Sequence, residues 1–287
     1  MKKVLYHYCS MDKFCSMMEN GTLRFSDITK SNDSEELHTI MNCYKQFLST
    51  KYQENDYNRL VSYMAGYLYD QTVNNETYYA VCFSGKRDSL SQWRGYAPQG
   101  GVMIGFNTEK LREYAGKIYD ALQSEKKDFC KLTEIEYIEV SMGKIDKKLE
   151  QLFLTFNNSI PVNNFEKLIE ISAKYKNKGF KEEQETRLCF PNFVLGNPDR
   201  REIAFTDREK PISLEYSTRE IDGKVSIYTF YDLPFPYEAV TEIIVGPKTY
   251  KSENEVRSCF LDSFETHHVN KALLNDFDIS RTRLSYR

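Results

Sequence analysis

The segment FKEEQETRLCF, residues 180–190, sets alternating carboxylates and one arginine directly before an apolar run. If the segment is a strand, Glu183, Glu185 and Arg187 share one face, because successive side chains point to opposite sides of a sheet. Like charges at positions i and i+2 repel each other, so this pattern favours a site that meets a cation or a positive charge developing in a reaction. The structural alternative is a solvated edge strand whose charges prevent aggregation. The segment alone supports both interpretations equally.

Outward from this segment, β-prone runs and runs with helical spacing follow each other without strict βαβ alternation. This order predicts an α+β sheet domain with helical insertions. Strands are expected near 3–8, 23–25, 78–84, 102–106, 133–141, 202–206, 212–218, 224–231 and 243–247, and helices near 10–20, 35–48, 55–71, 108–122, 143–177 (two helices) and 252–265. The polar residues 32–34 predict a helix start, and Asp222-Gly223 predicts a two-residue hairpin turn. Because no repeat or Pro/Gly-rich linker interrupts the chain, we predict a single domain over residues 1–287.

The composition excludes several classes of protein. The 287 residues carry 39 basic and 42 acidic side chains, a net charge of −3, so no global attraction to nucleic acid exists. Seven scattered cysteines without a C-x-x-C pair and four histidines predict reduced thiols and no metal site. The N-terminus lacks the apolar run of a signal peptide, and no window has the length and hydropathy of a membrane span. We therefore expect a cytoplasmic protein without a membrane partner.

Two residues at strand positions are candidates for ligand contacts. His7 faces opposite to its two tyrosine neighbours on the first strand, although a lone histidine is more often structural. Ser84 ends a hydrophobic strand and is followed by Gly85-Lys86-Arg87-Asp88, which predicts a rim that faces an anion. The glycine spacing of a dinucleotide fingerprint and the G-K-[ST] ending of a phosphate loop are both absent.

A third candidate surrounds the single tryptophan. Trp93, Arg94 and Tyr96 lie together on a predicted short helix and loop. These residue types suit stacking against a planar ring and pairing with a phosphate. The structural interpretation, in which Trp93 fills the core and Arg94 closes a salt bridge, is favoured by the residues alone.

Taken together, these blocks resemble a widespread family of uncharacterised bacterial proteins, whose order of blocks covers nearly the entire chain. The blocks are Leu5-Tyr6-His7-Tyr8, the return Gly21-Thr22-Leu23-Arg24-Phe25, Asn32-Asp33, Cys82-Phe83-Ser84, residues 89–96, residues 183–187, Ile244-Val245-Gly246-Pro247, and Ser280-Arg281 with Tyr286-Arg287. The most specific are Ser-Gln-Trp-Arg-x-Tyr and a Glu-x-Glu-x-x-Arg-like block, which here reads Glu-x-Glu-x-Arg.

The order of a strand histidine, a strand serine and a strand glutamate is in turn similar to the ADP-ribosyltransferase superfamily. This resemblance implies a split β-sheet core and NAD as a substrate rather than a metal cofactor. It implies that His7 binds the NAD ribose, that Ser84 supports the nicotinamide pocket, and that Glu183 or Glu185 is the catalytic acid. Tyr8, Trp93, Arg94, Tyr96 and Arg187 are the further expected contacts to NAD. Ser84 departs from the histidine-tyrosine-glutamate pattern of such proteins, which has a tyrosine there, so the resemblance does not identify the subgroup.

The reaction implied by the resemblance suits these residues. Cleavage of the nicotinamide–ribose bond develops an oxocarbenium-like cation, which a fixed carboxylate stabilises more in the transition state than in the ground state. The expected function is mono-ADP-ribosylation of a nucleic acid or protein by a toxin or phage-defence effector, with an antitoxin or defence protein as partner. The alternatives are an NAD glycohydrolase, a non-catalytic module that binds a nucleotide or nucleic acid, and a metal-dependent nuclease built on Glu183, Glu185 and Asp88.

Overall fold

A computed structural model gives the structure of the chain. It describes residues 3–28, 35–74, 78–122, 130–139, 145–156, 167–168, 170–191, 202–206, 208–221, 224–270 and 277–285. Three features of the sequence lie outside these ranges: the polar residues 32–34, the turn Asp222-Gly223 and the terminal Tyr286-Arg287.

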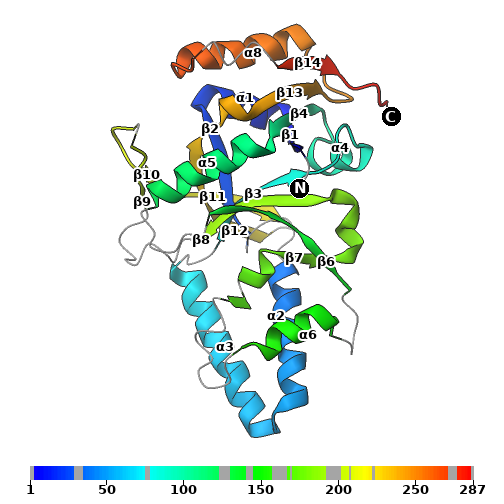
Figure 1. Cartoon of the computed structure of the whole chain (residues 1–287), viewed down its shortest axis with the longest axis vertical. Coiled ribbons are helices and arrows are strands. Elements are labelled where there is room, and N and C mark those ends of the chain that lie inside the picture. Colours follow the sequence, from blue (N-terminus) through cyan, green and yellow to red (C-terminus); the bar gives the residue numbers. More distant parts are fainter. Residues whose placement is uncertain are drawn as a thin grey trace.

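The central element is one mixed sheet of ten strands (Figure 1). Its strands are β1 (Val4–Ser10), β2 (Thr22–Asp27), β3 (Tyr78–Ser84), β4 (Gly101–Asn107), β5 (Lys131–Glu134), β8 (Glu185–Pro191), β11 (Glu215–Ile221), β12 (Lys224–Pro234), β13 (Val240–Val245) and β14 (Asp278–Arg281). The main order is β11-β12-β2-β3-β1-β4-β13-β14, with β8 also paired to β3 and β5 paired to β8. Only the β13–β14 pair of this sheet is parallel among the residues described. The expected mixture of strands and helices around one sheet is confirmed.

The sheet is nearly divided between β1 and β3. These two strands share a single register pair, Tyr6 with Ser84. By contrast, β1 and β4 pair over the whole of β1, and β3 pairs with β8 over seven positions. Next to this pair, a side chain instead of the backbone links the two strands, because His7 Nδ1 of β1 lies 3.0 Å from the Cys82 carbonyl oxygen of β3.

Helices cover both faces of the sheet. Alternate residues of the central strands, among them Leu5, Ile104 and Ile243, join one core with α1 (Met11–Asn20), α5 (Thr108–Ala121) and α8 (Glu253–Thr266). The intervening residues Tyr8, Met103 and Ile244 pack with α4 (Leu90–Tyr96) in another cluster. This separation follows from the two-residue period of a strand. It places α4 beside β1 on the face away from the main core.

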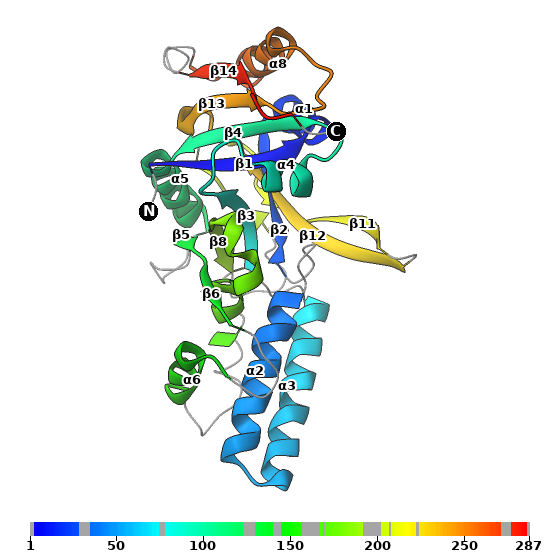
Figure 2. The same cartoon turned by 90° about the vertical axis from the view of Figure 1, so that its right-hand side faces the viewer.

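Two long helices leave the sheet as a side-by-side pair (Figures 1 and 2). They are α2 (Glu35–Lys51) and α3 (Glu54–Asn74), inserted between β2 and β3. Together with α6 (Lys147–Leu154), β6 (Glu136–Ile138) and β7 (Tyr175–Asn177), they build a second hydrophobic cluster around Tyr44, Phe47 and Phe153. The expected helical insertion is therefore present. The prediction of a single domain stays a prediction.

Local signals in the sequence set several boundaries. The Ser10 side chain accepts the Lys13 N–H at the start of α1, and Gly21 ends this helix with a left-handed φ of 62°. The hairpin of β11 and β12 has Ile221 opposite Lys224. The remaining elements are the short strands β9 (Glu202–Ile203) and β10 (Ile212–Ser213) and the 3-10 turns η2 (Lys178–Glu183) and η4 (Tyr237–Ala239). The strand expected over 133–141 is instead broken at Ile135 into β5 and β6.

Candidate functional site

A small cavity lies where β1 and β3 separate. The strand registers place Tyr6 opposite Ser84 and Ser84 opposite Glu185, so three residues from three strands form one row across the sheet. The cavity has a volume of about 70 Å³, and its lining combines strand, helix and turn residues. They are Tyr6, His7, Tyr8, Cys82, Phe83, Ser84, Gln92, Tyr96, Glu183 and Glu185. Six of the nine residues expected from the sequence thus line one cavity.

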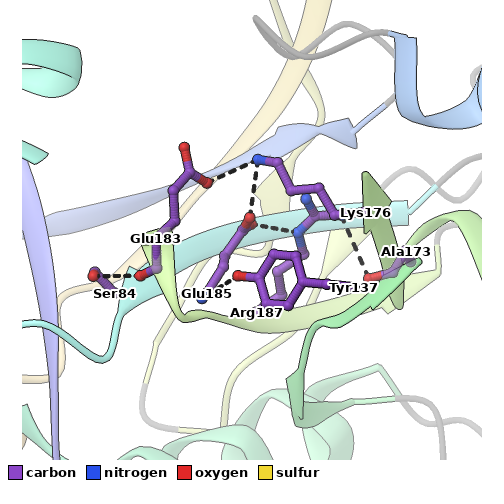
Figure 3. Close-up of polar contacts among 7 residues, drawn as sticks. All are labelled: Ser84, Tyr137, Ala173, Lys176, Glu183, Glu185 and Arg187. Atoms are coloured by element: carbon purple, nitrogen blue, oxygen red, sulfur yellow. Dashed lines mark hydrogen bonds and ion pairs between the residues drawn. The ribbon is translucent and has the colours of Figure 1, made fainter. Parts of the chain in front are cut away.

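Glu185 is buried at the inner wall of this cavity with cations around it (Figure 3). Arg187 Nε donates to its Oε1 atom at 2.6 Å, and Lys176 Nζ lies 3.1 Å from its Oε2 atom. Its backbone N–H donates to the Tyr137 hydroxyl at 2.8 Å. Burial alone would raise the pKa of Glu185, but Arg187 and Lys176 outweigh burial and lower the pKa to about 2. Glu185 is therefore a carboxylate at every physiological pH.

Glu183 reaches the cavity by another route than the sequence predicts. A continuous strand through residues 183–187 is wrong, because Lys178–Glu183 form η2 and β8 begins only at Glu185. Gln184 has a φ of 47°, a left-handed conformation that turns the chain between them. The Glu183 carboxylate lies 2.9 Å from Lys176 Nζ, and its backbone carbonyl accepts the Ser84 hydroxyl at 2.6 Å. The two glutamates therefore meet through their partners and not through strand periodicity.

Arg187 is buried as well, with an exposed fraction of 4%. It lies on the same face of β8 as Glu185, as predicted, and its NH1 donates to the Ala173 carbonyl at 3.4 Å. β8 lies between β3 and β5. The solvated edge strand is therefore the wrong interpretation of this segment. Arg187 does not line the cavity, and its side chain contacts Glu185, so its expected contact to NAD stays a prediction.

His7 lines the cavity opposite these acids and is half-buried. Its Nδ1 lies 3.0 Å from the Cys82 carbonyl oxygen. A carbonyl oxygen only accepts, so Nδ1 carries the hydrogen and Nε2 is left as an acceptor. Burial lowers the pKa of His7, so the ring is neutral at neutral pH. A neutral ring that presents an acceptor suits a hydroxyl group as ligand.

Tyr8 and Trp93 stabilise the turn after β3, next to the cavity. The Tyr8 hydroxyl donates to the Lys86 carbonyl at 2.6 Å and accepts the Ser89 N–H at 2.9 Å, so it fixes the turn after β3. Trp93 is fully buried, packs edge-on against the Tyr8 ring, and donates from Nε1 to Asp88 at 2.8 Å. Its expected role in stacking on a ligand is wrong, because no part of its ring is exposed. A Cβ at Gly246 would lie 2.5 Å from the Trp93 ring, which explains the glycine there.

The two polar neighbours of Trp93 differ in their positions. Tyr96 lines the cavity and is 42% exposed, so its ring borders both the cavity and solvent. Arg94 is exposed and does not line the cavity. Gln92, which the sequence analysis did not select, is buried at 4% exposure and lines the cavity. Helical geometry explains this, because Gln92 and Tyr96 are four residues apart and share one face of α4.

A second, open hollow, called the basic groove below, adjoins the cavity and shares Tyr6 with it. Its volume is about 640 Å³. It is lined by Lys3, Val4, Tyr6, Gly85, Lys86, Arg87 and Ser89. Arg87 pairs with Glu242 at 2.7 Å, so Lys3 and Lys86 supply net positive charge to this hollow. The predicted anion-facing rim after Ser84 therefore borders an open, basic groove.

The proposed nuclease site does not assemble. Asp88 accepts hydrogen bonds from Trp93 Nε1 and from the Thr282 hydroxyl, and it does not line the cavity with the glutamates. Within the described ranges, no group of three or more His, Cys, Asp or Glu side chains is arranged to hold a metal ion.

Lys176 and Tyr137, like Gln92, are site residues that sequence reasoning missed. Both come from the β6–β7 ribbon and belong to no motif, although Lys176 is only nine residues before Glu185 in the chain. The alternating pattern around Tyr137 indicates an ordinary amphipathic strand, and nothing in the sequence around Lys176 connects it to the acids.

Comparison with known proteins gives one match. A family described as a protein of unknown function (DUF2971) matches residues 92–188, about a third of the chain. This range begins within the Ser-Gln-Trp-Arg block and ends just after Arg187, so the match extends from α4 to the acidic strand. No curated protein and no solved structure matches the chain significantly. In the part of the chain that is described, no helix has the length and hydropathy needed to cross a membrane.

Proposed function

We propose that this protein is an NAD-dependent mono-ADP-ribosyltransferase that transfers ADP-ribose to a nucleic acid or a protein. One observation carries the proposal: an ionised glutamate, Glu185, lies beside Ser84 in a cavity whose other wall holds His7. The cavity opens at the division of the sheet between β1 and β3. This is the arrangement that the resemblance to ADP-ribosyltransferases implies.

The volumes of the cavity and the basic groove decide which part of NAD each could hold. A cavity of about 70 Å³ has room for a few waters or a small ring and not for a dinucleotide. The nicotinamide ring alone would occupy this cavity and the ribose would lie at its boundary, with His7 Nε2 accepting a ribose hydroxyl. The diphosphate would extend past Tyr6 into the groove, where Lys3 and Lys86 attract anions.

The chemistry follows from the charges. The bond between ribose C1′ and the nicotinamide nitrogen breaks, its electron pair leaves with neutral nicotinamide, and positive charge develops on the ribose. The Glu185 carboxylate, held in a buried and preorganised position, stabilises this charge. The acceptor forms the new bond to C1′ and releases a proton, for which the more exposed Glu183 is the base.

The test is direct. Full-length protein incubated with NAD should release nicotinamide, measured by chromatography, and a DNA, RNA or lysate acceptor should gain the mass of one ADP-ribose. Release without any labelled acceptor would identify an NAD glycohydrolase instead. Absence of both release and labelling under all three conditions would overturn the proposal.

The second candidate is a non-catalytic module that binds a nucleotide. It is favoured by one observation, that both carboxylate oxygens of Glu185 already have cationic partners. Calorimetry separates the two candidates, because the module should bind NAD without forming product and should keep its affinity when Glu185 is changed to Gln.

A further inference from the structure

We infer that Lys176 is a positioning residue, whose buried ammonium holds the Glu183 and Glu185 carboxylates side by side at the cavity. The inference rests on the proposed function for its catalytic consequence. Lys176 does not line the cavity, so it acts through the two glutamates and not on the substrate.

The contacts of Lys176 are those of a bridge between the two acids. Its Nζ lies 2.9 Å from Glu183 Oε2 and 3.1 Å from Glu185 Oε2 (Figure 3). Its side chain is 4% exposed, and its ammonium lies 4.6 Å from the centroid of the Phe180 ring. An ammonium offers three donors, so one group can bond both carboxylates.

The local charges explain why the bridge is needed. Glu183 lies on η2 and Glu185 on β8, with the left-handed Gln184 between them, so no regular ladder fixes one relative to the other. Two carboxylates that bond a single ammonium at these distances would repel each other without it. Lys176 bonds both, whereas Arg187 Nε donates to Oε1 of Glu185. Removing the ammonium should separate the two acids while leaving Glu185 paired with Arg187.

The origin of Lys176 gives this bridge its rigidity. Lys176 belongs to β7, which pairs with β6, and Tyr175 and Ile138 of this ribbon are buried in the helical cluster. Tyr137 of β6 accepts the Glu185 N–H from the same side. The β6–β7 ribbon, which packs on the helical cluster, therefore supports the acidic pair.

The test compares Lys176→Met, which removes the charge at similar length, with Lys176→Arg, which keeps the charge. Lys178→Met is the matched control, because Lys178 is two residues away and 61% exposed. Nicotinamide release should fall in kcat on the order of 100-fold for Lys176→Met, with KM for NAD nearly unchanged, since a small displacement of a catalytic group has this effect. Lys176→Arg should recover most of kcat, and Lys178→Met should match the wild type. Equal melting temperatures exclude unfolding as the cause.

The pH profile is a readout that a purely structural lysine would not move. The groups that face Glu185 are Arg187 from β8, Lys176 from β7, Tyr137 from β6, Cys82 from β3, Glu183 from η2 and Tyr96 from α4. Of these, Arg187, Lys176 and the Cys82 side chain lower the pKa of Glu185, the two cations most strongly. Loss of Lys176 should raise this pKa and move the acidic limb of the kcat profile to higher pH, and Lys176→Arg should restore the limb.

A measurement without turnover keeps this inference separate from the proposed function. In protein labelled with ¹³C at glutamate carboxyls, the Glu185 signal should titrate at higher pH in Lys176→Met than in the wild type. If the wild type releases no nicotinamide, the proposed function fails, while the carboxyl titration still tests the bridge. An unchanged Glu185 titration, or a fully active and folded Lys176→Met variant, would overturn the inference.

Discussion

Ser84 and Glu185 lie directly opposite each other in the ladder of β3 and β8, and the Ser84 hydroxyl donates to the backbone carbonyl of Glu183 at 2.6 Å. One serine thus fixes the position of both acidic residues, the first through the ladder and the second through its side chain. The Lys86 N–H donates in turn to the same hydroxyl at 3.1 Å. The end of β3 therefore connects the acids to the basic groove through a single oxygen.

Glu185→Gln should lower nicotinamide release by about 10²–10³-fold, because an oriented charge that stabilises the transition state is lost. Glu134→Gln on β5 is the control, since Glu134 is exposed and does not line the cavity. Steady-state rates with NAD check the difference. Equal rates for the two variants would show that Glu185 does not stabilise the transition state. Either Glu183 would then have this role, or the reaction would not take place at this cavity.

Glu185 should also set an acid limit to stability. Its pKa in the folded protein, about 2, lies below its ordinary value of 4.5, so its ionised form stabilises the fold above pH 4.5. This contribution should disappear as the pH falls from 4.5 toward 2. Urea denaturation at stepped pH should show wild type losing its stability advantage over Glu185→Gln in this window, with a constant difference above pH 5. A constant difference down to pH 2 contradicts the pairing.

Arg187→Met should destabilise the protein by about 3–5 kcal/mol, because it leaves the buried Glu185 carboxylate without its closest partner. Arg59→Met is the matched control. Arg59 pairs with Asp56 on the surface of α3, and the loss of such a pair changes stability by about 1 kcal/mol or less. Measuring the free energies of unfolding of both variants and of the wild type tests this difference. Similar small changes in both would show that Arg187 is not required to balance Glu185.

Trp93→Phe should lower stability and leave ligand affinity intact. The substitution removes the hydrogen bond from Nε1 to the Asp88 carboxylate, and a hydrogen bond to a charged group contributes about 1.5–3 kcal/mol. Thermal melting measures the first effect, and calorimetry with NAD below the melting temperature measures the second. A large loss of affinity at unchanged stability would restore the interpretation of Trp93 as a stacking residue.

Lys86→Ala should raise KM for NAD with little effect on kcat, since Lys86 lines the groove and not the cavity. Added salt should reduce NAD affinity less in this variant than in wild type, because one screened cation is gone. Lys181→Ala, on η2 and outside the groove, serves as control. An unchanged KM for NAD in Lys86→Ala would contradict the placement of the NAD diphosphate in the groove.

Sequence alone determined the elements whose signals are local. The serine cap and the left-handed glycine bounded α1, and β-prone runs identified the central strands, because caps and strand propensity depend mainly on neighbouring residues. The block order also directed attention to His7, Ser84 and the acids, which line one cavity in the structure.

Tertiary structure decided what connects these residues. The register that sets Ser84 opposite Glu185, the single pair of β1 and β3 at Tyr6, and the contact of Tyr137 with Glu185 all join segments separated by long stretches of chain. The broken strand at Glu183 has the same origin, since its carboxylate and carbonyl find their partners on β7 and β3. Burial, which turned Trp93 into a core residue and Arg187 into a partner of Glu185, depends on the packing of the whole chain, and no local pattern carries it.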